Sequence, residues 1–194
     1  MINRITLADL AVFGAHQKGH FSLSSGLHSG DYLQCALFLA NPSRAERAGQ
    51  ELAQAITAAM AEPSAIVAPA LGGMINGHET ARALKVPFLF TERVEGKMAL
   101  RRGFGVGPRQ AIVVVEDVVT TGGSTKEVID LIESLGGCVI GVASLVNRSG
   151  SDNPFEPRPY TALLQVSFPT WKPKECPLCR QGKPLVKPGS RPVK

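Results

Sequence analysis

The chain has 194 residues, of which 44% are hydrophobic and 19% are charged. This composition fits one globular domain with a sizeable core and excludes a disordered or fibrous chain. No apolar run approaches the roughly 18 residues that span a membrane, and the N-terminal residues lack the apolar core of an export signal. We therefore expect a cytoplasmic protein without a membrane partner, whose four cysteines are reduced thiols.

The formal net charge of +5 is concentrated at one end of the chain. Residues 172–194 contain seven Lys or Arg and one acid, whereas residues 1–171 contain 14 basic and 15 acidic residues. The bulk charge of the main domain therefore does not indicate a nucleic-acid-binding face, and a nucleic acid partner is not expected.

The first third of the chain predicts two helices around a turn-rich segment. A short helix is expected over Thr6–Ala15, with Thr6 as a cap. Residues 16–32 are rich in Ser, Gly and His and predict turns around a short strand near Phe21–Leu23. Asn41 then caps a helix that is expected over Pro42–Met60.

An alternating strand and helix pattern follows. Strands are expected at Ala65–Ala70, Pro87–Thr91, Gln110–Glu116, Cys138–Val146 and Tyr160–Phe168. Helices are expected at Met74–Leu84 and Lys126–Leu135, and a mobile charged loop at Glu92–Gly107. This alternation is typical of a parallel α/β sheet flanked by helices, with ligands bound at the carboxyl ends of the strands.

The last 26 residues differ from the rest. Residues 169–194 contain six prolines, seven basic residues and the pair Cys176 and Cys179 in a CxxC motif. We therefore predict a domain over residues 1–168, followed by a basic, Pro-rich tail over residues 169–194 that is extended or forms a small knuckle.

The segment that follows the buried run Ile112–Val115 is the most informative. It continues with two acids, two valines and a Thr/Gly/Ser loop that opens a helix: Glu116, Asp117, Val118, Val119, Thr120, Thr121, Gly122, Gly123 and Ser124. A glycine-containing loop at a helix N-terminus binds anions, because free N–H groups and the helix dipole favour negative charge.

The two carboxylates would repel a phosphate, so they are suited to hydroxyl groups, a cation or a developing positive charge. A ribose 5-phosphate offers a phosphate at one end and a diol at the other. The order of strand, acid pair and loop resembles the phosphoribosyl pyrophosphate (PRPP) signature of type I phosphoribosyltransferases. The alternative is an ordinary strand–loop–helix with a Gly-rich turn.

Two further segments fit a PRPP site. Leu71, Gly72 and Gly73 follow the first core strand, where backbone N–H groups could accept a pyrophosphate; a simple turn is the alternative. The loop Glu92–Phe104 carries four cations and is either a solvated charged loop or a lid that brings Arg93 or Lys97 to the leaving pyrophosphate.

The resemblance narrows to the orotate phosphoribosyltransferase family through three segments: His20–Tyr32, the lid around Lys97, and Val146–Arg148. It covers most of residues 5–168 and implies an N-terminal hood, PRPP and orotate as substrates, Mg²⁺, and a homodimer with shared sites. It implies that Thr120 and Arg148 hold orotate and that Arg93 and Lys97 act across the dimer. It also implies that Glu116 and Asp117 hold the ribose, which makes these two acids and Lys97 the catalytic candidates.

The sequence departs from that family at three places. Ser24 stands where family members often carry a Lys. Val94 stands directly after the lid Arg, where many members carry a second basic residue, and Ala99 stands where many carry a His. Arg101 or Arg102 would have to compensate for these missing cationic groups.

The CxxC motif offers two zinc ligands, whereas a structural zinc site needs four. Cys35, Cys138, a histidine or the tail of a second subunit would have to complete it; otherwise the motif is a proline-stiffened turn with free thiols. The four histidines show no spacing typical of a metal pair, so we expect them on the surface or in loops.

Two rival functions share the expected fold. One is a phosphoribosyltransferase for another nucleobase, and the other is a PRPP-sensing, RNA-binding regulator. Arg148 and the early Ser-Gly loop favour orotate, whereas a regulator should carry basic residues across the domain face, which residues 1–171 do not indicate.

Overall fold

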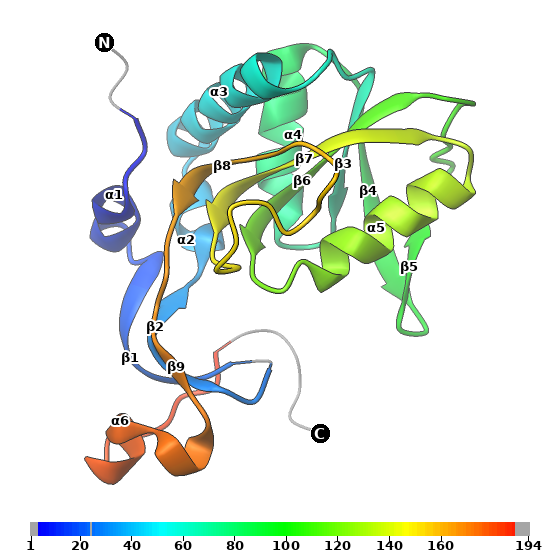
Figure 1. Ribbon diagram of the computed structural model, residues 1–194. Helices are drawn as coiled ribbons and strands as arrows, with labels where there is room; N and C mark the ends of the chain where they lie inside the picture. Colours follow the sequence, from blue (N-terminus) through cyan, green and yellow to red (C-terminus); the bar gives the residue numbers. More distant parts are fainter. Residues whose placement is uncertain (1–3, 24, 189–194) are drawn as a thin grey trace.

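The computed structural model describes residues 4–23 and 25–188, and its centre is a six-stranded sheet of order β5-β4-β3-β6-β7-β8 (Figure 1). All neighbouring strands are parallel except β4 and β5, which form an antiparallel hairpin. The strands are β3 (Ala65–Pro69), β4 (Phe88–Val94), β5 (Lys97–Leu100), β6 (Ala111–Val119), β7 (Cys138–Asn147) and β8 (Tyr160–Gln165). The expected parallel α/β sheet is confirmed.

Helices cover both faces of this sheet. They are α3 (Pro42–Ala59) and α4 (Gly73–Leu84) on one face and α5 (Gly123–Ser134) on the other (Figure 1). Successive residues of β6 explain the arrangement, because side chains alternate between the two faces of a strand. Ile112 and Val114 pack in the cluster that contains the buried residues of α5, and Val113 and Val115 pack in the cluster that contains those of α3.

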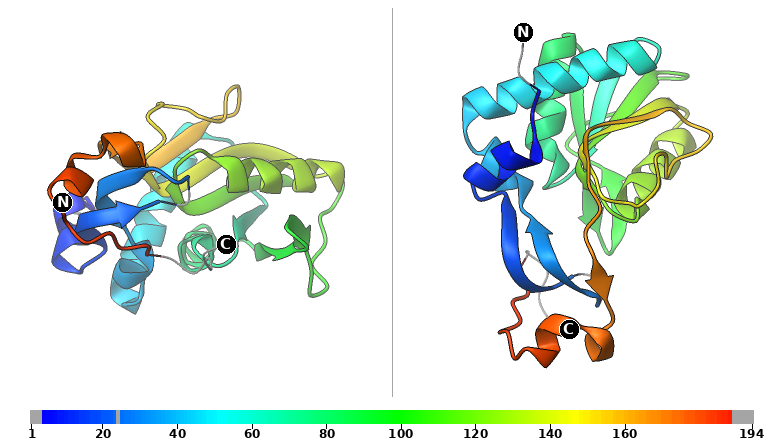
Figure 2. Two further views of the ribbon diagram at one scale, coloured as in Figure 1. Left: turned by 90° about the horizontal axis from the view of Figure 1, so that it is seen from below. Right: turned by 60° about the vertical axis from the view of Figure 1, so that its left-hand side comes forward.

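The remaining elements form a hood, which we define as the three-stranded antiparallel sheet β1-β2-β9 with its flanking helices. The hood extends away from the six-stranded sheet, and its last elements come from the tail (Figure 2). Its elements are α1 (Leu7–Val12), β1 (His16–Ser22), β2 (His28–Leu33), α2 (Cys35–Leu39), β9 (Thr170–Trp171), the 3₁₀ turn η1 (Pro173–Glu175) and α6 (Pro177–Arg180).

The expectation of turns over residues 16–32 is wrong, because this segment is the β1–β2 hairpin. Its Gly, Ser and His residues have weak strand propensity, and tertiary contacts supply what propensity does not. Strand β9 pairs with one edge of the hairpin through His28 and Trp171, and Val186 bridges to Phe21 on the other edge. The helix α2 was not predicted either.

Two further expectations need correction. The mobile loop expected over Glu92–Gly107 begins with the end of β4 and all of β5, which turn at Glu95 and Gly96, both with positive φ. The acid pair lies within β6 rather than after it, since that strand continues to Val119 and stays paired with β7.

The predicted domain of residues 1–168 and tail of residues 169–194 remain a proposal. Strand β9 begins just beyond that boundary and belongs to the hood sheet. Within the described ranges, no helix is both long and apolar enough to cross a membrane.

The helix α3 forms as expected, with the Asn41 side chain accepting a hydrogen bond from the Arg44 N–H at 3.2 Å and Pro42 in the first turn. It packs closely on α4 at Gly49, where an added Cβ would lie 2.4 Å from the carbonyl carbon of Glu79. Only glycine allows this approach, because backbone atoms cannot move aside as the end of a side chain can.

We therefore expect Gly49→Ala to lower the free energy of unfolding. Overpacking a core contact costs about 1–3 kcal/mol, and the approach to backbone atoms places this contact at the upper end of that range. After a gain of about 1 kcal/mol in helix propensity, a net loss of up to about 2 kcal/mol should appear in urea unfolding. The exposed neighbour Gln50, changed to Ala, is the control and should stay within about 0.5 kcal/mol of the wild type. A Gly49→Ala protein as stable as the wild type would contradict the close contact.

Candidate active site

The loop between β6 and α5 has the geometry of an anion site. Gly122 precedes the helix with φ 73°, and an added Cβ would lie 2.9 Å from Cε1 of the buried Phe155. No side chain caps α5, and Thr120, Thr121 and Gly123 are exposed. Apart from Gly123, whose N–H donates to Oγ1 of Thr121 at 3.4 Å, the first-turn N–H groups of α5 are therefore available to a phosphate.

The structure brings the predicted pyrophosphate loop against the acid pair. A Cβ on Gly72 would lie 2.8 Å from Oδ1 of Asp117, and one on Gly73 would lie 3.1 Å from Oε1 of Glu116. Leu71, by contrast, has a side chain that is 79% exposed, and the Ala70–Leu71 peptide bond is cis. The backbone at residues 71–73, rather than its side chains, is what faces the acids.

Glu116 and Asp117 differ in their surroundings. Burial, the adjacent Asp117 carboxylate and a hydrogen bond to Asp117 raise the pKa of the Glu116 carboxyl well above its ordinary value. Its backbone carbonyl accepts a hydrogen bond of 2.9 Å from the buried Asn76 amide, a contact that sequence analysis did not foresee. Asp117, in contrast, is only half-buried.

Arg148 lies at the same edge of the sheet, one strand further. Its N–H donates to the carbonyl of Val119 at 2.8 Å, its Nη2 donates to Oγ of Ser29 at 3.2 Å, and its Cζ lies 5.2 Å from the ring centroid of Phe168. Burial lowers the pKa of the Arg148 guanidinium, and the nearby Asp31 and Tyr32 oppose that shift.

Sequence analysis assigned no individual role to Ser29 and Tyr32, although both lie in the segment that carried the resemblance. Burial raises the pKa of the Tyr32 hydroxyl, Asp117 raises it further and Arg148 lowers it. Tyr32 is thus near enough to Asp117 and Arg148 for both of them to shift its pKa.

Within one chain, the predicted lid residues Arg93 and Lys97 lie apart from the acid pair and Arg148. Arg93 forms a two-bond pair with Glu127 of α5, at 2.8 and 2.9 Å, and Arg102 a similar pair with Glu92. Lys97 is exposed at the start of β5. Among the described residues, no hydrogen bond or ion pair joins Arg93 or Lys97 to the acid pair.

The structure describes two of the three positions at which the sequence departs from the family pattern. Val94 is 37% exposed and Ala99 partly buried, on the two strands of the β4–β5 hairpin. Arg102, one of the two candidates for compensation, is paired with Glu92, and Ser24 lies outside the described residues.

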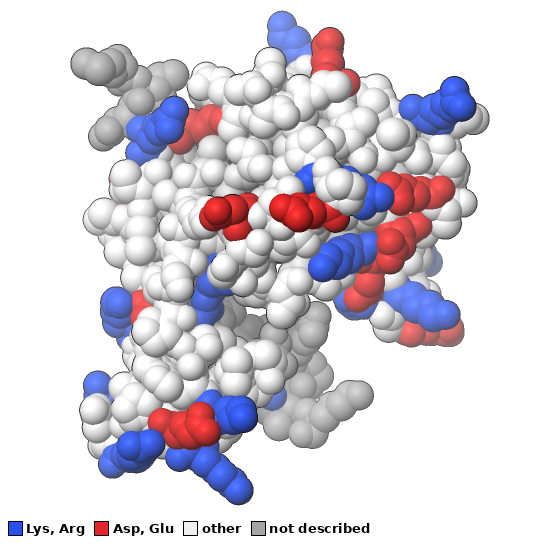
Figure 3. Space-filling view, viewed as in Figure 1, with Lys and Arg blue, Asp and Glu red and all other residues white. Residues whose placement is uncertain are grey.

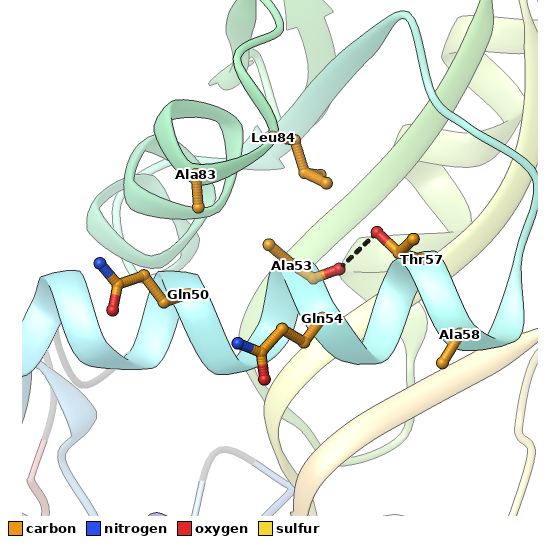
Figure 4. A pocket seen from close by; sticks show the side chains of 7 residues that line it. All are labelled: Gln50, Ala53, Gln54, Thr57, Ala58, Ala83 and Leu84. Carbon is orange, nitrogen blue, oxygen red and sulfur yellow. Dashed lines mark hydrogen bonds between the residues drawn. The ribbon is translucent and has the colours of Figure 1, made fainter. Parts of the chain in front are cut away.

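A surface hollow lies elsewhere, between α3 and α4 (Figure 4). Gln50, Gln54 and Thr57 line it from α3, and Ala83 and Leu84 from α4. The Thr57 hydroxyl donates to the carbonyl of Ala53 at 3.0 Å, and no lining residue is an acid, a base or a thiol. This hollow therefore offers no group for the chemistry considered above.

The expected surface or loop position of the histidines is wrong for His20 and His28, which are buried on β1 and β2. They lie together with Cys176 and Cys179, so a group that could hold a metal ion is complete within one chain. Cys35 is buried in the core between hood and sheet, and Cys138 is exposed at the start of β7, so neither belongs to this group.

Charge is distributed unevenly over the surface. On the face shown in Figure 3, acidic and basic side chains alternate over the α/β part, and basic ones gather around α6. Residues 172–188 contribute five basic side chains and only Glu175 as an acid. The basic pI of the chain is thus a feature of the tail in three dimensions as well.

Comparison with known proteins agrees with this geometry. The phosphoribosyl transferase domain family matches residues 38–162. An orotate phosphoribosyltransferase of Carboxydothermus hydrogenoformans is 55% identical over 174 residues, which are 90% of this chain and 91% of that protein. That of Desulforamulus reducens is 47% identical over 193 residues, 99% and 100% of the two chains.

Among solved structures, the orotate phosphoribosyltransferase of Aeropyrum pernix is similar with a TM-score of 0.64 and 26% identity, over 81% of this chain and 91% of that one. Sequence and fold therefore agree, and the chain belongs to the orotate phosphoribosyltransferase family, with the type I phosphoribosyltransferase fold.

Proposed function

We infer that this chain transfers the 5-phosphoribosyl group of PRPP to orotate, which yields orotidine 5′-monophosphate and pyrophosphate in pyrimidine biosynthesis. The observation that supports it best is the meeting of three groups at one sheet edge. An uncapped helix N-terminus, an acid pair packed on a Gly-Gly loop, and a half-buried Arg148 lie at the carboxyl ends of neighbouring parallel strands. The helix N-terminus suits the 5′-phosphate, the acid pair suits the ribose, and Arg148 suits orotate.

PRPP binding uses backbone groups at two loops. The 5′-phosphate binds the N–H groups and hydroxyls of Thr120, Thr121, Gly122, Gly123 and Ser124, with Val118 and Val119 positioning that loop from β6. The pyrophosphate binds the backbone of residues 71–73. Binding the two ends of the substrate holds the ribose carbon C1 between the acid pair and the incoming base.

The chemical step is a substitution at ribose C1. The bond from C1 to the pyrophosphate oxygen breaks with its electron pair leaving on the pyrophosphate, and the ring oxygen shares the positive charge that develops. The N1 lone pair of orotate forms the new bond to C1, and the proton of N1 passes to the released pyrophosphate or to water. Asp117 stabilises that charge, and Glu116, whose pKa burial raises, holds a ribose hydroxyl.

The residues present fit a Mg²⁺ ion that is held mainly through PRPP. Mg²⁺ prefers oxygen ligands and usually binds one or two carboxylates together with substrate phosphates, and Asp117 offers a half-buried carboxylate beside Gly72. When bound, the ion neutralises charge on the leaving pyrophosphate.

We assign the selection of orotate over other nucleobases to Arg148 and Thr120. A guanidinium suits the orotate carboxylate because the two can form paired hydrogen bonds. Phe168 and Ser29 hold the Arg148 side chain in place. Uracil and adenine have no carboxylate, so a half-buried Arg at this position favours orotate over the other nucleobases.

Asp117→Asn is expected to reduce kcat at least about a hundredfold with little change in the melting temperature, because it removes the charge that faces the developing cation. Steady-state kinetics and thermal unfolding measure the two effects. The exposed Asp130 of α5, changed to Asn, is the matched control and should retain activity. Near-normal turnover of Asp117→Asn would refute this role.

Arg148→Ala is expected to raise the KM for orotate at least about tenfold and the KM for PRPP much less. Truncating one partner of a buried, hydrogen-bonded charge pair typically costs about 2–5 kcal/mol. Arg158→Ala, which removes an exposed pair with Glu133, is the control. Equal effects on both substrates, or consumption of uracil or adenine in preference to orotate by the wild type, would exclude Arg148 as the orotate anchor.

The active site is proposed to be shared in a homodimer, with Lys97 and Arg93 reaching the partner's pyrophosphate. This is supported by the exposed position of Lys97 near the tip of the hairpin, which Arg93 and Glu127 fasten to α5. An isologous dimer would place each hairpin at the other site.

Mixing inactive Lys97→Ala with inactive Asp117→Asn should therefore restore activity, to about a quarter of wild type after random exchange of subunits in an isologous dimer. Half of the dimers are then hybrids, and one of their two sites is intact. The control mixes Lys97→Ala with the Lys97→Ala, Asp117→Asn double variant, which leaves no intact site. If exchange is demonstrated and no activity returns, the shared site is wrong.

A further inference from the structure

Four side chains that are far apart in the sequence meet between the hood hairpin and the tail. His20 lies on β1, His28 on β2, Cys176 immediately before α6 and Cys179 within it. One nitrogen or sulfur atom from each lies within 4.8 Å of those of the other three.

The distances between these atoms match a tetrahedral zinc site. Nε2 of His20 lies 3.0 Å from Nδ1 of His28, and three sulfur–nitrogen distances are 3.3, 3.5 and 3.6 Å. Zinc bonds of about 2.0–2.1 Å to nitrogen and 2.3 Å to sulfur, at tetrahedral angles, separate two nitrogens by roughly 3.3 Å and nitrogen from sulfur by roughly 3.5 Å. The spacing is therefore that of ligands around one ion.

The ring of His20 is oriented for this role. Its Nδ1 lies 2.9 Å from the carbonyl oxygen of Lys183, which can only accept a hydrogen bond. The proton of the neutral ring is therefore on Nδ1, and Nε2 presents its lone pair to the other three ligand atoms. A carbonyl behind the far nitrogen is the usual outer partner of a zinc-bound histidine.

Burial and charge also fit a divalent ion. The exposed fractions of His20, His28 and Cys176 are 3%, 5% and 0%. Zn²⁺ would bind both cysteines as thiolates and release their two protons to solvent. Two thiolates balance the ion, so the site, which is buried except for the exposed Cys179, is neutral and avoids the cost of an unpaired charge.

The tail has little else to hold it. Among residues 169–188, Cys176 is the one that is fully buried, and none of them belongs to the three hydrophobic clusters. Backbone hydrogen bonds join Val186 to His20 and Ser22, each at 2.8 Å. A unit this small without an apolar core commonly depends on a metal or disulfide.

We propose that His20, His28, Cys176 and Cys179 bind one structural Zn²⁺ ion, which fastens the tail to both strands of the hood hairpin.

The ion is also close to the proposed orotate anchor. His28 precedes Ser29, whose hydroxyl donates to the Pro169 carbonyl at 3.1 Å and accepts from Arg148 at 3.2 Å. Through the Ser29 hydroxyl the ion positions Arg148. The consequence of this for orotate binding rests on the proposed function. Loss of the ion should therefore weaken orotate binding more than it slows turnover.

The test begins with the full-length chain, purified without a histidine tag under reducing conditions. We expect about one zinc per chain by elemental analysis, and X-ray absorption at the zinc edge should show two sulfur ligands at about 2.3 Å and two nitrogens at about 2.0–2.1 Å. A chain that lacks zinc and takes up none when titrated with Zn²⁺ overturns the proposal, as does a bound ion without sulfur ligands.

Variants locate the ion. Cys176→Ser and His28→Ala should lose zinc, whereas Cys138→Ser and the exposed His78→Ala should keep it. Full zinc content in Cys176→Ser would overturn the site. Should these variants fail to fold, removing zinc from the wild type with a chelator replaces them: the melting temperature should fall and recover with Zn²⁺ but not with Mg²⁺, and an unchanged melting temperature contradicts a structural role.

Kinetics of the chelated wild type test the link to Arg148. We expect the KM for orotate to rise several-fold and to recover with Zn²⁺, with a smaller change in kcat and in the KM for PRPP, and unchanged constants would contradict the coupling. Zinc content and absorption spectra do not depend on catalysis. A chain that binds zinc but does not consume orotate would support the metal site and refute the proposed function.

Discussion

The site depends on the close approach of the backbone after β3 to a pair of acids at one edge of a parallel sheet. Gly72 and Gly73 lie so near Asp117 and Glu116 that a methyl group at either position would collide with a carboxylate oxygen or a backbone carbonyl. The backbone after β3 therefore fills the space that side chains would otherwise occupy. This contact fixes the spacing of the two segments that we propose to bind pyrophosphate and ribose, since both strands are fixed by the core beneath them.

A buried acid next to a second acid is costly, and the structure shows how the cost is limited. Glu116 retains a proton more readily than an ordinary carboxyl because burial and Asp117 raise its pKa. Asp117, by contrast, is half-buried and stays accessible at the edge of the sheet.

Sequence patterns were reliable where local signals agree. The run Ile112–Val115, the acid pair and the Thr/Gly loop predict one strand and one helix, and both form, because hydrophobic pattern, glycine and helix start indicate the same geometry. The hood hairpin was missed because its strands contain Gly, Ser and His, and its edges are covered by residues more than a hundred positions away. The end of β4 and all of β5 were mistaken for a loop, since the charged Glu92, Arg93 and Lys97 lie there beside residues that are only partly buried.

The candidate site was predictable to the same extent. The glycines at 72 and 73 follow β3 and the acids at 116 and 117 lie near the end of the neighbouring β6, so topology alone places them together. The partners of Arg148 did not follow from pattern, because Ser29 reaches it from the hood and Phe168 from beyond β8. The role of His20 and His28 was hidden for a related reason, since their partner cysteines lie in the tail.

The pairing of the hood hairpin with the tail has a consequence for synthesis on the ribosome. His20 and Cys176 are separated by 156 positions, and a chain emerges at about 5–20 residues per second. The β1–β2 hairpin that receives the tail is therefore exposed for roughly ten to thirty seconds, during nearly the whole of translation, with β9 and Val186, which cover its two edges, still unmade. The six-stranded sheet can assemble during that interval, whereas the hood is completed only once residues 170–186 have been made.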